Sequence, residues 1–104
     1  MIKLTNPEIE QVLVFSTTHI TKEDDYKLST LTDSELMIDK HEYGYRVYIS
    51  NVPHELESII YAIREEGMSE AFINLYKLAH SMGVQWIKFD CDGTIYKELP
   101  TFSW

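Results

Sequence analysis

The hydrophobic pattern of this chain changes its period near Val52, and this change constrains the fold more than any other feature of the sequence. Between residues 35 and 51, apolar and polar side chains alternate with the period of two that is typical of β-strands. Turn-forming residues gather at Asp39–Gly44, so the stretch predicts a β-hairpin. The alternation assigns Tyr45, Val47 and Ile49 to one face of the second strand, and Arg46 and Tyr48 to the other.

From Pro53 onward the apolar spacing becomes helical. Pro53 suits the first turn of a helix, and this helix is expected to end at Gly67. Its apolar residues recur at i, i+3, i+4 and i+7, namely Leu56, Ile59, Ile60 and Ile63. A second helix is predicted between Ser69, which can cap it, and Gly83. The side chains expected on its buried face are Phe72, Leu75, Ala79 and Met82.

Shorter signals flank this central region. The apolar run Val12–Ser16 predicts a buried strand, and the capping-box spacing of Thr21 and Asp24 predicts a helix over Lys22–Leu31. Near the end of the chain, Trp86–Phe89 and Ile95–Tyr96 lie on either side of Asp92–Gly93. A two-residue Asp-Gly loop between apolar segments predicts a second hairpin.

These elements predict a single α+β domain spanning residues 1–104. The expected order is β-α-β-β-α-α-β-β, with a mostly antiparallel or mixed sheet of about five strands and the helices on one face. A length of 104 residues and an apolar share of 44% are sufficient for one core. Neither a membrane-spanning stretch nor a signal peptide is expected, and the single cysteine, Cys91, agrees with a cytoplasmic location.

The charge balance argues against direct binding to nucleic acid. Nine basic residues face 17 acidic ones, a net charge of −8, and the basic residues form no patch that could hold phosphates. Two acidic clusters, Glu23–Asp25 and Glu65–Glu70, could imitate a row of phosphates and occupy a nucleic-acid-binding site on a host protein. The ordinary interpretation is that they are solvated helix ends.

The string Asp90-Cys91-Asp92-Gly93-Thr94 resembles the nucleophile motif of the haloacid-dehalogenase phosphohydrolases. That resemblance implies Asp90 as nucleophile, Asp92 as acid and base, and bound magnesium. However, only ten residues follow Thr94, too few to supply the rest of such a site. The predicted hairpin turn also explains the string, so a magnesium-dependent phosphohydrolase is the less supported alternative.

No other set of residues predicts catalysis, a metal site or a cofactor. The four histidines have no spacing that would bring two of them together on one helix face or across a strand. His19, in the loop after the first predicted strand, is the one whose position favours a role, although a hydrogen-bonded loop residue is the more common outcome. Cys91 lies between two aspartates, which disfavours its thiolate.

Aromatic residues are the remaining signal, since several of them are expected to exceed what the core can hold: Tyr43, Tyr48, Tyr96, Phe102 and Trp104. Tyrosine and tryptophan are favoured at protein interfaces because they combine a large apolar area with a polar edge. If the helices cover one face of the sheet, the other face would carry an aromatic and basic patch. The residues predicted to bind a partner or a second copy are Tyr43, Arg46, Tyr48, Phe102 and Trp104. Alternatively, the C-terminal tail covers that face.

Several segments resemble a family of small uncharacterised proteins from bacteria, phages and plasmids, defined only as a domain of unknown function. The segments are Phe15–Thr21, Tyr43–Tyr45, Glu65–Phe72 and Leu99–Trp104. The resemblance implies an intracellular protein from a mobile element, and it implies no activity. Taken together, the sequence favours a non-catalytic protein-interaction module, ahead of the acidic decoy and the phosphohydrolase.

Overall fold

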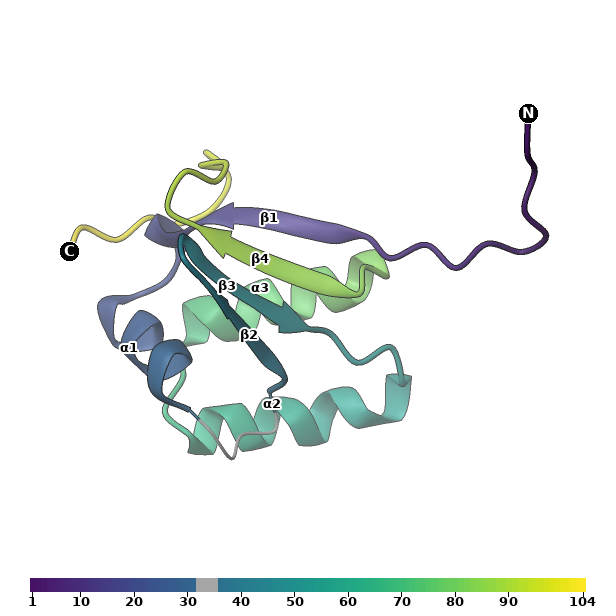
Figure 1. Cartoon of the computed structure of the whole chain (residues 1–104). Coiled ribbons are helices and arrows are strands. Elements are labelled where there is room, and N and C mark those ends of the chain that lie inside the picture. The colour runs from purple at the N-terminus through teal and green to yellow at the C-terminus, as the bar shows by residue number, and fades with distance from the viewer. Residues whose placement is uncertain (32–35) are drawn as a thin grey trace.

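The computed structural model describes residues 1–31 and 36–104 (Figure 1). Glu35, where the predicted hairpin pattern begins, lies outside the described residues. The elements along the chain are β1 (Val12–Ser16), the 3-10 turn η1 (Thr17–His19), α1 (Lys22–Thr30), β2 (Ile38–His41), β3 (Gly44–Tyr48), the 3-10 turn η2 (Pro53–Glu55), α2 (Leu56–Glu65), α3 (Glu70–Met82) and β4 (Trp86–Asp90).

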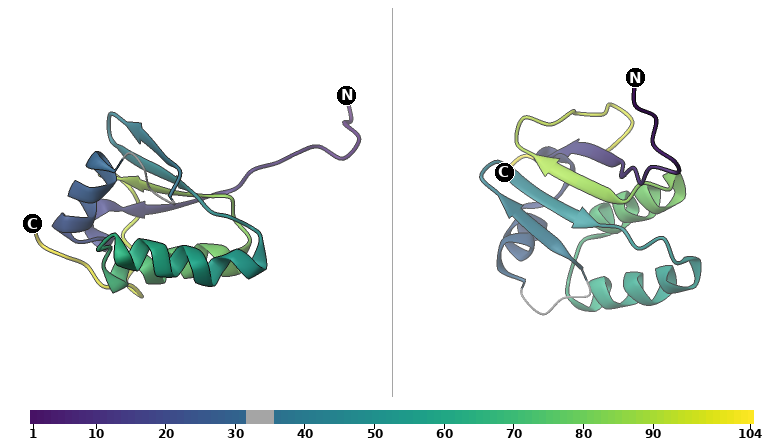
Figure 2. Two further views of the ribbon diagram at one scale, coloured as in Figure 1. Left: turned by 90° about the horizontal axis from the view of Figure 1, so that it is seen from below. Right: turned by 45° about the vertical axis from the view of Figure 1, so that its right-hand side comes forward.

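The sheet has the strand order β1-β4-β3-β2. β1 pairs with β4 in parallel, and the β4–β3 and β3–β2 pairs are antiparallel. α2 and α3 lie side by side on one face of this sheet, so the molecule has two layers, and α1 lies apart from them beside β2, whose Lys40 bonds Ser29 O (Figure 2). The α+β class and the mixed sheet are therefore confirmed.

The predicted fifth strand is wrong, and the sheet has four strands. Asp92–Gly93 does form a turn, in which Gly93 N donates to Asp90 O at 2.9 Å. The chain then crosses the end of β1, where Ser16 N donates to Thr94 O at 2.8 Å. A hairpin cannot form at this turn because β4 is an inner strand, and both of its edges are already occupied by β1 and β3.

Local sequence signals set the helix ends as predicted. The Thr21 side chain accepts from Asp24 N while the Asp24 side chain accepts from Thr21 N, which is a complete capping box at the start of α1. Ser69 caps α3 at its N-terminus. Gly83 ends α3 with φ of 73°, a left-handed conformation that glycine adopts without a steric penalty.

The core lies between the sheet and the helices. Inward side chains of the strands, including Phe15, Val47, Ile87 and Phe89, are fully buried against apolar residues of α2 and α3. Phe89 packs against both Phe15 and the α3 residue Phe72, with ring centroids 5.9 and 5.8 Å apart. The faces predicted for α2 and β3 are confirmed. Met82, by contrast, is exposed, because it lies in the last turn of α3 beyond the edge of the core.

The two ends of the chain behave differently. Residues 1–11 form no helix or strand and extend away from the body (Figure 1), so the molecule measures 48 Å in its longest direction against 31 and 27 Å in the others. Residues 91–104 instead fold back over the end of β1. In the described ranges, no helix has both the length and the apolar character needed to cross a membrane.

Candidate interaction surface on the open sheet face

The side of the sheet opposite the helices is the candidate functional surface, here named the open face. Pleating and strand register bring polar, aromatic and apolar side chains together on it. None of the described helices packs on this side (Figure 2). Its members are Val12, Val14, Asp39, His41, Arg46, Tyr48, Trp86, Lys88 and Asp90.

An aromatic and cationic cluster occupies one end of the open face. The guanidinium carbon of Arg46 lies 4.3 Å from the ring centroid of Trp86, within the range of a cation–π contact. Tyr48 meets the same indole edge to face at 5.3 Å. Arg46 also pairs with Asp39 across the β2–β3 hairpin, with Nη2 to Oδ2 at 3.2 Å. These contacts fix three large side chains at the surface, and we call Arg46, Tyr48 and Trp86 the Arg46–Trp86 cluster.

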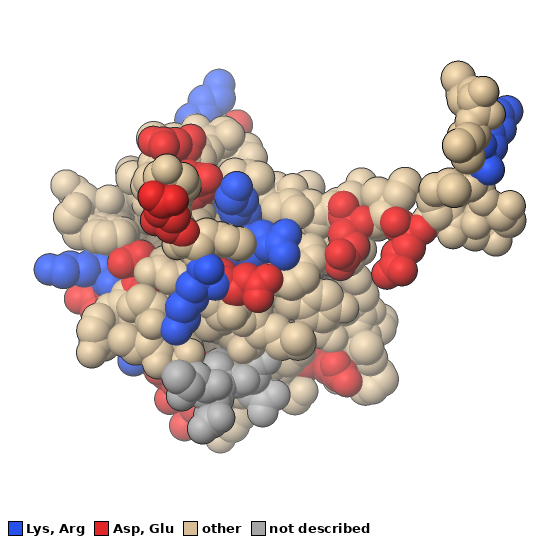
Figure 3. Space-filling view, viewed as in Figure 1, with Lys and Arg blue, Asp and Glu red and all other residues tan. Residues whose placement is uncertain are grey.

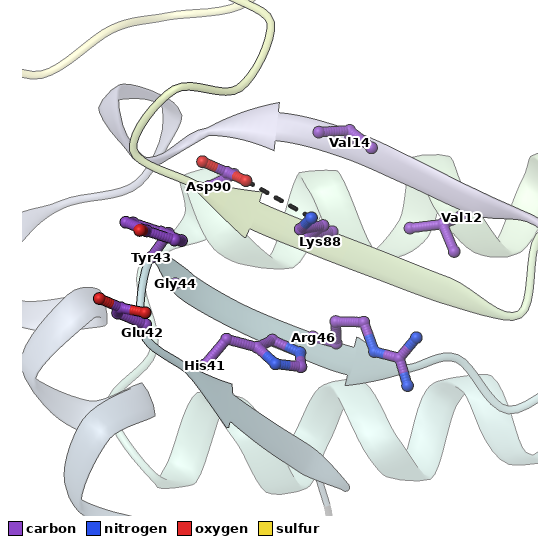
Figure 4. Close-up of a pocket in the computed structure, with 9 residues that line it drawn as sticks. All are labelled: Val12, Val14, His41, Glu42, Tyr43, Gly44, Arg46, Lys88 and Asp90. Carbon is purple, nitrogen blue, oxygen red and sulfur yellow. Dashed lines mark ion pairs between the residues drawn. The ribbon is translucent and has the colours of Figure 1, made fainter.

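The other end of the open face is hollowed. A depression of about 580 Å³ is lined by Val12, Val14, His41, Glu42, Tyr43, Gly44, Arg46, Lys88 and Asp90 (Figure 4). Arg46 and Lys88 are cross-strand neighbours in the β3–β4 register, so two cations lie side by side. Lys88 Nζ is 3.5 Å from Asp90 Oδ2. Basic and acidic groups consequently alternate over the middle of this face (Figure 3).

Arg46 has donors to spare for a partner. Its Nη2 donates to Asp39, whereas its Nε is buried without a hydrogen-bond partner among the described residues, so only the terminal Nη groups can reach a partner. A guanidinium offers five N–H donors, and it binds carboxylates with two of them at once. The open face therefore offers a partner the aromatic rings of Tyr48 and Trp86 together with an Arg46 guanidinium whose donors are only partly used.

The predicted partner-binding residues do not form one patch. Arg46 and Tyr48 lie together in the cluster, and Tyr43, at the hairpin turn, lines the open-face hollow together with Arg46. Tyr43 also lines a second hollow, of about 320 Å³, together with Trp104. Phe102 lies apart from Arg46 and Tyr48, beside the start of α1.

The C-terminal segment does not cover the open face, which was the alternative expectation. Phe102 N donates to Thr18 O at 2.8 Å, and Trp104 Nε1 donates to Ile20 O at 3.0 Å. These bonds hold the segment against η1 and the start of α1. The open face is thus exposed as far as residues 1–31 and 36–104 are concerned.

His19 is a structural residue that anchors the C-terminal segment. Its side chain is buried, Nδ1 lies 2.8 Å from Pro100 O, and Nε2 accepts a hydrogen bond from Tyr96 N at 2.8 Å. Both bonds form together only when Nδ1 carries the proton and Nε2 accepts. The ring of Tyr96 packs on Phe15, with centroids 5.6 Å apart, so this tyrosine is not among the surplus surface aromatics. Sequence reasoning placed His19 in a polar loop and missed its burial, because its partners lie more than 70 residues away.

Asp24 joins the N-termini of two helices. Besides its bond to Thr21 N, its buried carboxylate accepts hydrogen bonds from Ser69 N at 2.9 Å and from Ser69 Oγ. Ser69 Oγ in turn accepts from Phe72 N at 3.1 Å. The capping-box spacing of Thr21 and Asp24 predicted the contact at the start of α1. No local sequence signal could predict the hydrogen bonds from Ser69, at the start of α3, to Asp24.

The two acidic clusters lie next to each other because of this link. Asp24, however, is buried and fully engaged, and Glu70 forms a two-bond pair with Arg64, with distances of 3.0 and 2.9 Å. This hydrogen-bonded arginine lowers the pKa of Glu70. A continuous row of unpaired carboxylates is therefore not formed by these two clusters.

The Asp90–Asp92 string forms a tight local turn. Asp90 Oδ1 accepts from Asp92 N at 2.8 Å, and Asp90 Oδ2 faces Lys88. One ligand atom from each of Asp90, Cys91 and Asp92 lies within 4.8 Å of the others, and these three are the only such group among the described residues. None of the described histidines joins them. The turn accounts for the string without a bound ion.

A smaller hollow, of about 360 Å³, lies between the sheet and α2, beside the hydroxyl of Tyr76. Ser50 N donates to Tyr76 Oη at 3.4 Å. Burial raises the pKa of Tyr76, and the nearby Glu55 and Tyr48 raise it further. This tyrosine is thus neutral well into the alkaline range.

The fold and its surface define a small α+β domain with a mixed four-stranded sheet, helices on one face and an open, aromatic and cationic face on the other. The chain belongs to the DUF5983 family, a family of unknown function, because residues 12–104 match the model of its C-terminal domain. The predicted resemblance to a domain of unknown function is confirmed. No match to this chain is found among curated proteins or solved structures.

Proposed function

We propose that this protein is a non-catalytic interaction module that binds a protein partner through its open face. The main supporting observation is the Arg46–Trp86 cluster, in which two aromatic rings and a guanidinium are held on the sheet face opposite the helices. The indole N–H of Trp86 is bonded to Glu10 of the N-terminal segment. Tyr, Trp and Arg are the residues that most often dominate binding energy at protein interfaces. Holding them in contact before binding lowers the entropy lost on association.

The chemistry of the face also describes its partner. Arg46 and Lys88 lie side by side, and each already touches a carboxylate of its own chain. The valines of β1 supply an apolar wall to the hollow. We therefore expect a partner segment that presents carboxylate and apolar side chains. Its carboxylates would replace those of Asp39 and Asp90 as the ion-pair partners of Arg46 and Lys88.

Affinity capture with matched tyrosine variants tests this proposal. The partner retained by the wild-type protein should bind at least about tenfold more weakly to Tyr48→Ala and Arg46→Ala, as expected for interface hot spots. The control is Tyr61→Ala, since Tyr61 is 67% exposed on α2, on the other side of the molecule. Equal retention by Tyr48→Ala, Arg46→Ala and Tyr61→Ala would contradict the proposal.

A second candidate function is the acidic decoy. The two clusters, adjacent at Asp24 and Ser69, form no continuous row of carboxylates, but they leave Glu23 and Glu65 exposed for a basic partner. A partner held by exposed carboxylates should elute at moderate salt, because ionic screening shortens the reach of charges. It should be lost in a Glu23→Gln, Glu65→Gln double variant and kept by Tyr48→Ala. A partner resistant to salt would exclude this function.

The cellular setting is part of the same proposal. Cys91 is a free and exposed thiol, which agrees with a reducing cytoplasm. We place the module in bacteria and their mobile elements, as the sequence resemblance implies. Fractionation of a host expressing the protein from its own gene would test the cytoplasmic location.

A further inference from the structure

The two edges of the sheet differ in how well they are protected. β2 forms one edge and carries Asp39, Lys40 and His41, and Lys40 Nζ donates to Ser29 O of α1 at 2.8 Å. Charged residues, lysine in particular, are the usual protection of an edge strand against pairing with another chain. β1 forms the opposite edge and reads Val-Leu-Val-Phe-Ser, with no charge and no proline.

Backbone groups of β1 point outward along this unprotected edge. Gln11 O accepts from Trp86 N on the β4 side, whereas Ser16 N donates to Thr94 O outside the sheet. Because successive residues of a strand turn their backbone groups to opposite sides, the N–H and C=O groups of Val12 and Val14 face away from β4. β1 pairs only with β4 among the described strands, so these groups have no strand partner.

Apolar chain is also exposed next to this edge. Residues 1–11 continue the line of β1 away from the body (Figure 1). The end of this segment nearest the sheet is held by a hydrogen bond in which Trp86 Nε1 donates to Glu10 Oε2 at 3.0 Å. Beyond that point Ile2 and Ile9 are 89% and 72% exposed. Exposed apolar side chains beside an unpaired strand mark an interaction surface.

We propose that β1 is a self-association edge, at which the β1 strands of two copies pair antiparallel about a twofold axis at Leu13. The arrangement is self-complementary, because the outward groups of Val12 meet those of the partner's Val14 and exchange both hydrogen bonds. The two sheets become one continuous sheet, with both open faces on the same side. Each N-terminal arm then passes the far end of the other β1, where Ile95 is exposed in the loop after β4. This inference goes beyond the proposed function, since it concerns a different surface.

Sedimentation velocity of the full chain with edge variants tests the pairing. The wild-type protein should sediment as a dimer, and Val14→Pro should sediment as a monomer. Proline removes the outward N–H of residue 14 without removing a bond to β4, which is why it is tolerated on edge strands. Val12→Lys should also be monomeric, whereas Val52→Lys should remain a dimer, because Val12 and Val52 are similarly exposed, at 40% and 38%. Circular dichroism confirms that each variant is folded.

Hydrogen exchange supplies a second readout that does not depend on any variant. The amides of Val12 and Val14 should exchange quickly at low protein concentration and become protected as the concentration rises. A monomer at high concentration, a dimer that survives Val14→Pro and Val12→Lys, or amides that stay unprotected would each overturn the proposal. The proposed function is judged separately, because Tyr48→Ala should weaken capture of the partner while leaving the dimer intact.

Discussion

Replacing Asp24 should weaken the fold more than the loss of one charge on a helix would suggest. Its buried carboxylate accepts three hydrogen bonds, from Thr21 N, Ser69 N and Ser69 Oγ, and so caps α1 while holding the start of α3. Asp24→Ala leaves all three donors without this acceptor. At about 1 kcal/mol for each bond, and somewhat more for bonds to a charged group, the expected loss is about 3 to 4 kcal/mol. Total stabilities of such domains are only about 5 to 15 kcal/mol.

Urea unfolding followed by fluorescence measures this loss, and Glu23→Ala is the matched control. Glu23 lies in the same first turn but is exposed, so its removal should cost less than about 1 kcal/mol. Asp24→Asn should fall between the two, because one amide oxygen remains while the NH₂ group faces a donor. A double-mutant cycle with Ser69→Ala should give a coupling of about 1 to 2 kcal/mol. Equal losses for Asp24→Ala and Glu23→Ala would refute the bridging role.

Three further predictions concern single positions. Gly44→Ala should cost about 3 kcal/mol in urea unfolding, because a Cβ would lie 1.8 Å from Phe89 O and force β3 away from β4; an unchanged midpoint would contradict this. His19→Ala should release the C-terminal segment, seen as rapid cleavage after Tyr96 in limited proteolysis, whereas the wild-type segment resists. Because burial raises the pKa of Tyr76 in the folded state above its usual value of about 10, stability should be complete below that pH and should fall above it. Tyr76→Phe should reduce this alkaline slope, and an identical slope would show that other groups cause it.

The sequence predicts those parts of the fold that are encoded locally. The capping box at Thr21, the cap at Ser69 and the helix end at Gly83 all form as expected, since each depends on residues within a few positions. The alternation around Arg46 likewise places the two faces of β3 correctly, because strand geometry alone sets it.

Apart from Met82, which lies beyond the edge of the core, the failures involve partners that are distant in sequence. The Asp92–Gly93 signal is a true turn, but its hairpin is prevented because β1, at the other end of the chain, occupies the required edge of β4. On the candidate surface, too, only the features set by local sequence could be predicted. Tyr48 and Arg46 could be assigned to one face, whereas their contact with Trp86 depends on pairing between β3 and β4. The position of the C-terminal aromatics could not be predicted, because the bond between Trp104 and Ile20 has no local signature.

The parallel pairing of β1 with β4 also determines the order in which this protein can fold. Gln11 and Gln85, which meet at the start of this pair, are 74 residues apart in sequence, whereas the β2–β3 hairpin closes over a two-residue turn. Closing the long loop costs chain entropy before any contact repays it, so the hairpin and the α2–α3 pair should form first and β1 should join last. Substitutions in β1 should then mainly accelerate unfolding, while substitutions in the hairpin should mainly slow refolding. The edge that we assign to self-association would thus be the last part of the sheet to become ordered.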